Sequence, residues 1–191
     1  MSVIYRPAAA GDAEAIADLH ADSWRRFYRG AYADSFLDGD VLTDRRGVWT
    51  DRLASRDPLS ITLVAEVDDA VAGFVRVALD WDPRWGSLLD NLHVRHDTQR
   101  LGVGSGLIVR AARGAAERGM TTALHLFVLE QNTAAQAFYA AHGGSPVERV
   151  AVSPPNGVPG RLNGQPYSLC YAWPDARALA PVRPAEPSHG R

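Results

Sequence analysis

The segment LDNLHVRHDTQRLGVGSGLIVRAA, residues 89–112, decides the fold of this chain of 191 residues. Its apolar start predicts a β-strand, and the apolar spacing after residue 104 predicts an amphipathic helix that continues to about Arg118. Between them lies a turn that contains Gly102, Gly104 and Gly106. Gly102 and Gly104 let the backbone approach a ligand closely, and the helix start offers unpaired N–H groups at the positive end of its dipole. The segment therefore predicts an anion-binding site, and a diphosphate is the ligand that fits it best.

Two side chains beside this turn, Gln99 and Arg100, add hydrogen-bond donors to the predicted site. A Rossmann dinucleotide fold is disfavoured, because its motif has the spacing G-x-G-x-x-G and follows the first strand of the chain. Here the glycine-rich turn follows three predicted strands and two predicted helices.

All 20 basic residues are arginine, so the chain contains no lysine. This excludes P-loop nucleotide chemistry, protein-kinase chemistry and Schiff-base chemistry, each of which requires a lysine amine. A formal charge of −2 does not indicate binding to nucleic acid or to an anionic membrane. A single cysteine excludes an internal disulfide and a Cys-based zinc site. We expect no metal. The chain has neither a signal-peptide pattern nor an apolar run of roughly 18 residues, and a cytoplasmic location is expected.

The order of predicted elements is β-α-α-β-β-β-α-β-α-β-β, which is not a regular alternation of strand and helix. It predicts a mixed α/β (α+β) domain in which helices cover both faces of a mixed sheet. The predicted strands cover residues 3–6, 61–67, 71–79, 88–94, 123–129, 147–152 and 167–173, and the predicted helices cover 11–23, 43–55, 104–118 and 133–142. We expect one domain over residues 1–174 and a disordered tail rich in Pro and Ala over 175–191.

Two motifs at the expected separation resemble the GNAT superfamily of N-acetyltransferases. Gln99-Arg100-Leu101-Gly102-Val103-Gly104 matches its acetyl-CoA pyrophosphate motif, Q/R-x-x-G-x-G/A, and Asn132 to Tyr139 matches its second block, N-x-x-A-x-x-F-Y. The resemblance covers residues 3 to about 173. It implies a mostly antiparallel sheet of six or seven strands, with a bulge in the fourth strand and a splayed cleft between the fourth and fifth strands.

The resemblance also implies how acetyl-CoA, the cosubstrate, is held. The pantetheine arm lies in the cleft against freed backbone groups of the fourth strand, one of which faces the thioester carbonyl. The diphosphate lies on the backbone after Gln99, Asn132 contacts the pantetheine, and Tyr139 protonates the departing thiolate. The implied cofactor-binding residues are Leu92, His93, Val94, Gln99, Arg100, Leu101, Gly102, Val103, Gly104, Ser105 and Asn132.

An amine acceptor arrives protonated at neutral pH, so a base has to remove a proton. Asp90 is the predicted base, because it precedes Leu92 and Val94 at a spacing of two and is therefore expected on their side of the strand. Glu66 and His93 are the alternatives. A structural role for Asp90, a core-packing role for Tyr139 and a purely helix-capping role for Asn132 stay open.

The predicted activity is transfer of acetyl from acetyl-CoA to a primary amine by direct attack in a ternary complex. The main alternative is a non-catalytic acyl-CoA-binding sensor or partner module. A weaker alternative keeps the enzyme and changes the donor to a longer acyl-CoA. The acceptor is a small-molecule or peptide amine that no motif identifies. Its specificity is expected to lie in the first two helices and in the loops 81–86 and 153–166. Trp24, Phe27 and Tyr28 either line an acceptor pocket or cap the hydrophobic core. No nucleic-acid or membrane partner is expected, and the resemblance allows a homodimer.

Overall fold

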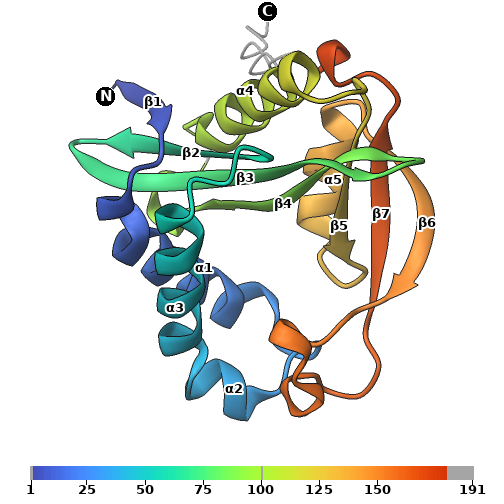
Figure 1. Ribbon diagram of the computed structural model, residues 1–191. Helices are drawn as coiled ribbons and strands as arrows, with labels where there is room; N and C mark the ends of the chain where they lie inside the picture. Colours follow the sequence, from blue (N-terminus) through green and yellow to red (C-terminus); the bar gives the residue numbers. More distant parts are fainter. Residues whose placement is uncertain (1, 100, 180–191) are drawn as a thin grey trace, which may run out of the picture.

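A single seven-stranded sheet organises the chain (Figure 1), in the strand order β1-β2-β3-β4-β5-β7-β6. The computed structural model describes residues 2–99 and 101–179. Neighbouring strands are antiparallel except for the pair β4 and β5, which is parallel. The strands are β1 (Val3–Pro7), β2 (Ser60–Val67), β3 (Ala70–Asp82), β4 (Gly86–Val94), β5 (Leu124–Leu129), β6 (Ser145–Ala151) and β7 (Tyr167–Trp173). The predicted mixed, mostly antiparallel sheet is confirmed.

Helices cover both faces of this sheet, as predicted (Figure 1). The α-helices are α1 (Ala13–Phe27), α2 (Asp34–Asp38), α3 (Val41–Ala54), α4 (Val103–Arg118) and α5 (Thr133–Ala141). Short 3-10 turns are η1 (Ala10–Asp12), η2 (His96–Thr98), η3 (Pro155–Gly157), η4 (Pro159–Arg161) and η5 (Ala176–Ala178). None of the helices formed by the described residues is long and apolar enough to cross a membrane.

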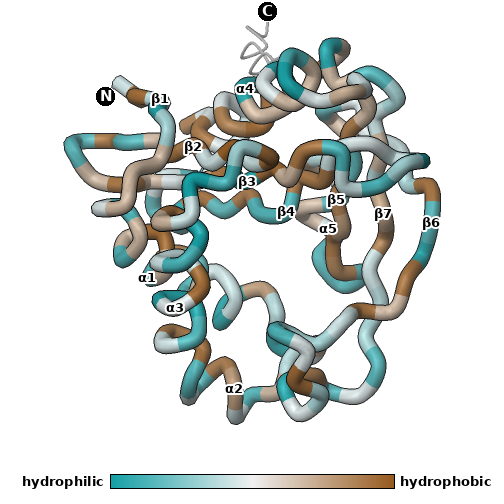
Figure 2. The backbone as a smooth tube through the Cα atoms, viewed as in Figure 1, coloured by the Kyte–Doolittle hydropathy of each residue, from teal (hydrophilic) through white to brown (hydrophobic). Residues whose placement is uncertain are grey.

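The hydrophobic core has one layer on each side of the sheet. Side chains of α4 and α5 pack with the strands on one face, where Leu107 and Ile108 are fully buried. On the other face, Ile16 of α1 and Trp49 of α3 pack against Phe74 of β3. Figure 2 shows the corresponding pattern, with hydrophobic residues along the central strands and on the side of α4 that faces them. The two layers hold α1 and α4 on opposite sides of β4.

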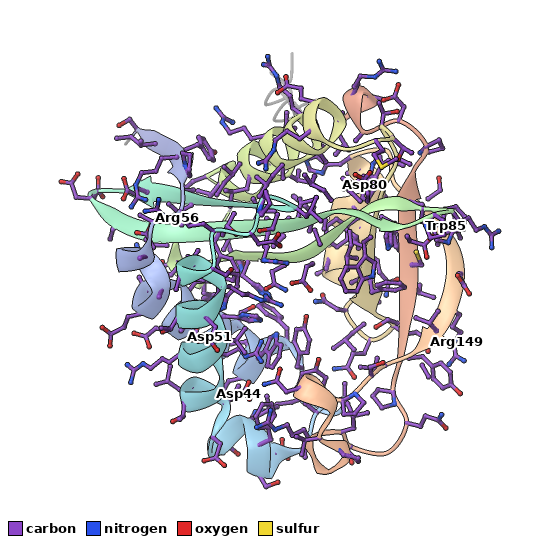
Figure 3. All side chains as sticks on the ribbon, in the orientation of Figure 1. Asp44, Asp51, Arg56, Asp80, Trp85 and Arg149 are labelled. Atoms are coloured by element: carbon purple, nitrogen blue, oxygen red, sulfur yellow. The ribbon has the colours of Figure 1, made fainter. Side chains whose placement is uncertain are left out.

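The largest differences from the predicted elements concern α1, α2 and β3. Helix α1 continues four residues past the expected end at residue 23, because Trp24 is buried and extends its inner face. The short helix α2 was not predicted. Strand β3 continues through Trp81, which was expected in a loop, so the β3–β4 turn is confined to residues 83–85. Figure 3 shows Asp80 and Trp85 at this end of the sheet, far from Asp44 on α3.

The packed part of the chain reaches Leu179, five residues beyond the expected domain boundary at residue 174. Within this segment, Ala176 and Leu179 are buried in the core layer that contains α4, and Ala176 N–H donates to the carbonyl of Thr122. Residues 180–191, the rest of the expected tail, lie outside the described residues.

Candidate active site

Within the described residues, strands β4 and β5 are hydrogen-bonded only where both begin. Ser87 pairs with Leu124 and Leu88 with His125, and no later pair joins the two strands in the described chain, so they diverge toward their carboxyl ends. The predicted splay is therefore confirmed. A groove of about 790 Å³ opens between the separated strands. It is lined by Ser23, Phe27, Tyr28, Leu92, His93, Val94, Thr98, Gln99, Leu101, Gly102, Val103, Gly104, Ser105, Phe127, Val128, Leu129, Asn132, Ala134, Ala135, Phe138 and Tyr139.

At one end of the groove lies the start of α4. Gly102 caps the helix in the left-handed conformation, with φ at +79°, which strains any residue with a Cβ. The first helical turn leaves the N–H groups of Val103, Gly104 and Ser105 without intrahelical partners, and the helix dipole makes this end positive. The backbone here can hold an anion with no lysine. Gln99 and Leu101 line the approach to the turn, and Arg100 lies outside the described residues.

The other two glycines of the turn have different spatial roles. A Cβ on Gly104 would lie 3.5 Å from side-chain atoms of Val94 and Phe138, so the glycine keeps this wall of the groove open. A Cβ on Gly106 would lie 1.9 Å from the hydroxyl oxygen of Tyr5. Gly106 therefore serves the packing of β1 on α4, and Gly104 serves the groove.

The hydroxyl of Ser105 is oriented by a buried histidine at the C-cap of α5. His142 Nδ1 lies 2.8 Å from the carbonyl oxygen of Phe138, which only accepts, so this nitrogen carries a proton. In the neutral ring Nε2 then accepts from the Ser105 hydroxyl, 3.1 Å away. Ser105 therefore offers its backbone N–H to the groove, while its hydroxyl proton is engaged by His142.

Helix α5 supplies Asn132 and Tyr139 to the opposite wall. Asn132 is the N-cap, and its Oδ1 accepts from the N–H of Ala135 at 3.1 Å, so the capping role is confirmed. Its place in the groove lining leaves the predicted cofactor contact as a prediction. Tyr139 is 9% exposed and also lines the groove. Burial, and to a smaller extent the nearby phenol of Tyr28, raises the pKa of Tyr139, so its phenol stays protonated and able to donate.

The bulge that the resemblance implied in the fourth strand is located at Asp90. Arg76 of β3 pairs with Asn91, whereas Val77 pairs with Leu89, so one residue of β4 has no partner. An extra residue of this kind interrupts the ladder and bends the strand. The bend begins at the point from which β4 leaves β5.

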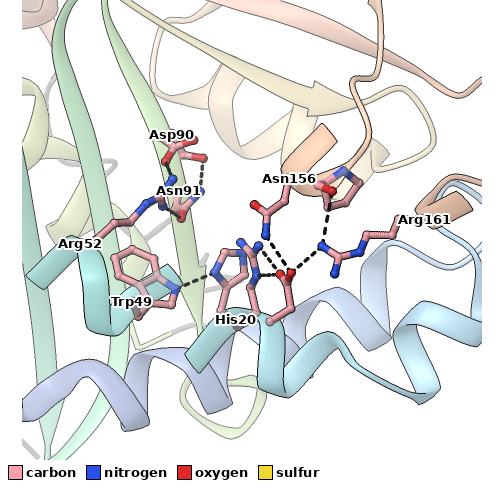
Figure 4. Close-up of polar contacts among 10 residues, drawn as sticks. His20, Trp49, Arg52, Asp90, Asn91, Asn156 and Arg161 are labelled. Carbon is pink, nitrogen blue, oxygen red and sulfur yellow. Dashed lines mark hydrogen bonds and ion pairs between the residues drawn. The ribbon is translucent and has the colours of Figure 1, made fainter. Parts of the chain in front are cut away.

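The bulge also moves Asp90 to the other face of the sheet. Leu92 and Val94 pack toward α4, whereas the Asp90 carboxylate lies 3.0 Å from Arg52 of α3 (Figure 4). It also lies 3.5 Å from Arg76. The shorter contact lacks hydrogen-bond alignment, so it is an ion pair only. The prediction that Asp90 shares the side of Leu92 and Val94 is wrong, because one inserted residue reverses the alternation of faces. Asp90 is absent from the groove lining.

The two alternative bases have different surroundings. Glu66 of β2 accepts a hydrogen bond at 3.0 Å from Nε of Arg6, outside the groove. His93 lines the groove, and its Nδ1 lies 2.7 Å from Oγ of Ser23 on α1. Burial, and to a smaller extent the charge of Arg45, lowers the pKa of His93 to about 3, so the imidazole is neutral.

A second histidine lies behind His93. Trp49 donates to Nδ1 of His20 at 3.0 Å (Figure 4). The His20 ring centroid lies 4.6 Å from that of His93. Sequence reasoning did not single out His20 or Ser23. The available signal was their spacing of three, which places two polar residues on the buried face of α1.

Aromatic residues at the end of α1 form the far wall of the groove. Phe27 and Tyr28 line it, whereas Trp24 lies beneath them, with its ring stacked 5.4 Å from that of Tyr28. Of the three residues expected at the acceptor, two therefore lie at the groove and one supports it. Burial, followed by the charge of Asp90, raises the pKa of Tyr28 to about 12.

The loop between β6 and β7 is tied to α3 by a buried carboxylate. Asp44 accepts from Arg45 at 2.5 Å, from Asn156 at 2.8 Å and from Arg161 at 2.5 Å (Figure 4). A cavity of about 450 Å³ lies between this loop and the end of β5, and it shares Leu129 with the groove. Its other lining residues are Gly30, Ala31, Glu130, Gln131, Asn163, Gln165, Pro166 and Tyr167. The loop expected at the acceptor thus lines an open hollow next to the groove.

Comparison with protein families and known structures gives consistent results. Residues 14–143 match the model of the acetyltransferase (GNAT) family. Among curated proteins, no significant sequence match was found. Many solved structures share the fold.

Three of these structures illustrate the similarity. The PaiA N-acetyltransferase of Thermoplasma acidophilum, in complex with coenzyme A, is 18% identical with a TM-score of 0.70, over 91% of this chain and 100% of that one. YncA of Salmonella typhimurium, with its cofactor acetyl-CoA, is 17% identical with a TM-score of 0.63, over 100% of both chains. The ribosomal-protein-alanine N-acetyltransferase of Brucella melitensis is 19% identical with a TM-score of 0.64, over 89% of this chain and 98% of that one.

Proposed function

The chain belongs to the acetyltransferase (GNAT) family, and we propose that it transfers acetyl from acetyl-CoA to a primary amine by direct attack in a ternary complex. One observation carries the proposal: a single groove connects the free N–H groups of α4 with the splayed backbone of β4 and with the end of α1. Both substrates can therefore meet between β4 and β5 without a covalent acetyl-enzyme.

The residues of the groove fit acetyl-CoA at its diphosphate, along its pantetheine arm and at its thioester carbonyl. Gly102, Val103, Gly104 and Ser105 present backbone N–H groups to the diphosphate, which a positive helix end stabilises. Leu92, His93 and Val94 offer strand backbone that β5 leaves unpaired, and an N–H directed at the thioester carbonyl stabilises the oxyanion as charge develops there. PaiA and YncA, which share the fold, were solved with coenzyme A and acetyl-CoA.

Tyr139 is proposed as the donor to the departing thiolate. Its phenol lines the groove, and burial keeps it protonated at neutral pH. A raised pKa makes full proton transfer to a thiolate uphill, but a hydrogen bond from the phenol still stabilises the leaving sulfur.

The competing proposal is an acyl-CoA-binding module without turnover. Cofactor binding is common to both, so it is tested first: acetyl-CoA at 100 times its Kd should stabilise the fold by about 2.7 kcal/mol, which is roughly 5–10 °C in Tm at this chain length. No shift would contradict both proposals. Release of free CoA thiol in the presence of a panel of small amines and peptides would then support the enzyme, and binding without release would support the module.

Tyr139→Phe tests the donor. The rate of CoA release should fall about 10²-fold or more, because a positioned acid contributes that much, while the Kd for acetyl-CoA stays within a few-fold. Tyr171→Phe is the matched control, since Tyr171 lies in the same core layer with its ring 6.2 Å from that of Tyr139 but does not line the groove. Equal rates for the two variants would contradict the role of Tyr139.

A further inference from the structure

The proposed transfer requires a proton acceptor, because an amine that has attacked the thioester carries a positive charge on nitrogen. Asp90, the base expected from the sequence, lies outside the groove in an ion pair with two arginines. Of the described groove-lining residues, only Tyr28, His93 and Tyr139 have titratable side chains. Both phenols are held protonated by burial, so they donate protons and do not accept them.

We infer that His93 is the catalytic base, and that Ser23 and His20 are the residues that position it. The inference rests on the proposed transfer and assigns the group that completes it. Because Nδ1 is engaged by Ser23 at 2.7 Å, Nε2 is the nitrogen left for a molecule in the groove. Ser23 lines the groove beside His93, on the side where α1 closes it.

The His93 ring is positioned by His20, which packs on the side of the ring away from the groove. Trp49 fixes the orientation of His20 through its indole N–H, and His20 then packs against His93 at a tilt of 33°. Ser23 and His20 from α1 and the uncharged Phe74 from β3 contact the His93 ring, and the charge of Arg45 from α3 acts on it. No carboxylate is among these groups. Burial keeps the imidazole neutral, so the Nε2 lone pair is available to the amine, and protonation of the ring depends on the charge that develops during the reaction.

The proton balance of the step is closed. The amine nitrogen bonds to the thioester carbon as the C=O π electrons move to oxygen, and His93 Nε2 takes a proton from that nitrogen. The C–S bond then breaks as the carbonyl re-forms, and the Tyr139 phenol donates a hydrogen bond to the leaving thiolate. The proton that His93 took from the amine passes through solvent to this thiolate, so the enzyme is restored with an amide and free CoA thiol as products. The negative charge that develops on oxygen favours the imidazolium while it exists.

His93→Gln and His93→Ala test the inference, with His96→Gln as the matched control, because His96 is an exposed histidine outside the groove lining. With an amine that wild type uses, the single-turnover rate should fall about 10²–10⁴-fold in both variants, while the Kd for acetyl-CoA changes by a few-fold at most. Added imidazole should restore part of the rate to His93→Ala. If that variant fails to fold, His93→Gln, which is closer in size, carries the comparison of rate and Kd.

Ser23→Ala separates positioning from chemistry. It should lower kcat about 10-fold, which is less than the loss on removing the base, with KM for acetyl-CoA unchanged. A His93→Gln rate within three-fold of the His96→Gln rate would overturn the role of His93 and leave the transfer intact. A loss confined to acetyl-CoA affinity would overturn it as well. No CoA release by wild type with any amine would overturn the transfer and this inference together.

Discussion

Asp44→Ala is expected to be among the most destabilising single changes at the acceptor side. The side chains of Asp44 and Arg45 are each 6% exposed, and that of Arg161 is 20% exposed. Removing the carboxylate leaves a buried arginine without a counter-charge, which costs about 3–5 kcal/mol. Arg161 is partly exposed, so water takes up part of its charge and the loss should lie at the lower end of this range, about 3 kcal/mol.

Urea denaturation measures this loss directly, and the Tm should fall by roughly 6–12 °C for a domain of this size. Asp51→Ala is the matched control, since Asp51 is an exposed aspartate on the same helix (Figure 3) and should change stability by less than about 0.5 kcal/mol. Limited proteolysis should also cut the loop 153–166 faster in Asp44→Ala, because Asn156 and Arg161 lose their anchor. Equal stability of the two variants would refute the view that this carboxylate holds the loop.

Two further predictions concern the fold. Gly86→Ala should lower the free energy of unfolding, measured by heat or urea, by about 2–5 kcal/mol, because φ is +74° and the new Cβ would lie 2.3 Å from the Ala123 carbonyl oxygen. Gly47→Ala is the control: its Cβ would have no atom within 4 Å, so it should stabilise α3 slightly. Equal effects of the two changes would contradict the close approach at Gly86. Asp12→Asn should cost about 1–2 kcal/mol at pH 7. The Arg6 hydrogen bonds lower the pKa of Asp12 in the folded state, so this stabilisation is present above the unfolded value near 3.9 and is lost as pH falls through the folded pKa. Urea unfolding from pH 7 to pH 2 should therefore show wild type and variant converging below about pH 4, and a constant difference would contradict the ion pair.

Much of the fold was predictable because its signals are local. The turn at Gly102 and the helix after it follow from residues that are neighbours in the chain, and so does the N-cap at Asn132. The mostly antiparallel sheet and its splay came from the motif resemblance, not from periodicity. The prediction for Asp90 was wrong because period-two counting assumes an uninterrupted ladder, and the bulge is a property of the pairing with β3.

Sequence alone determined that this chain has a strand, a glycine turn and a helix start in succession, because each backbone conformation there depends on adjacent residues. Only the tertiary structure decided which side chains meet at the groove and at the loop beside it. Ser23 and His93 are 70 positions apart, and Asp44 and Arg161 are 117 apart. Contacts over such separations form when α1 and α3 pack against one face of the sheet, and local patterns carry no information about that packing.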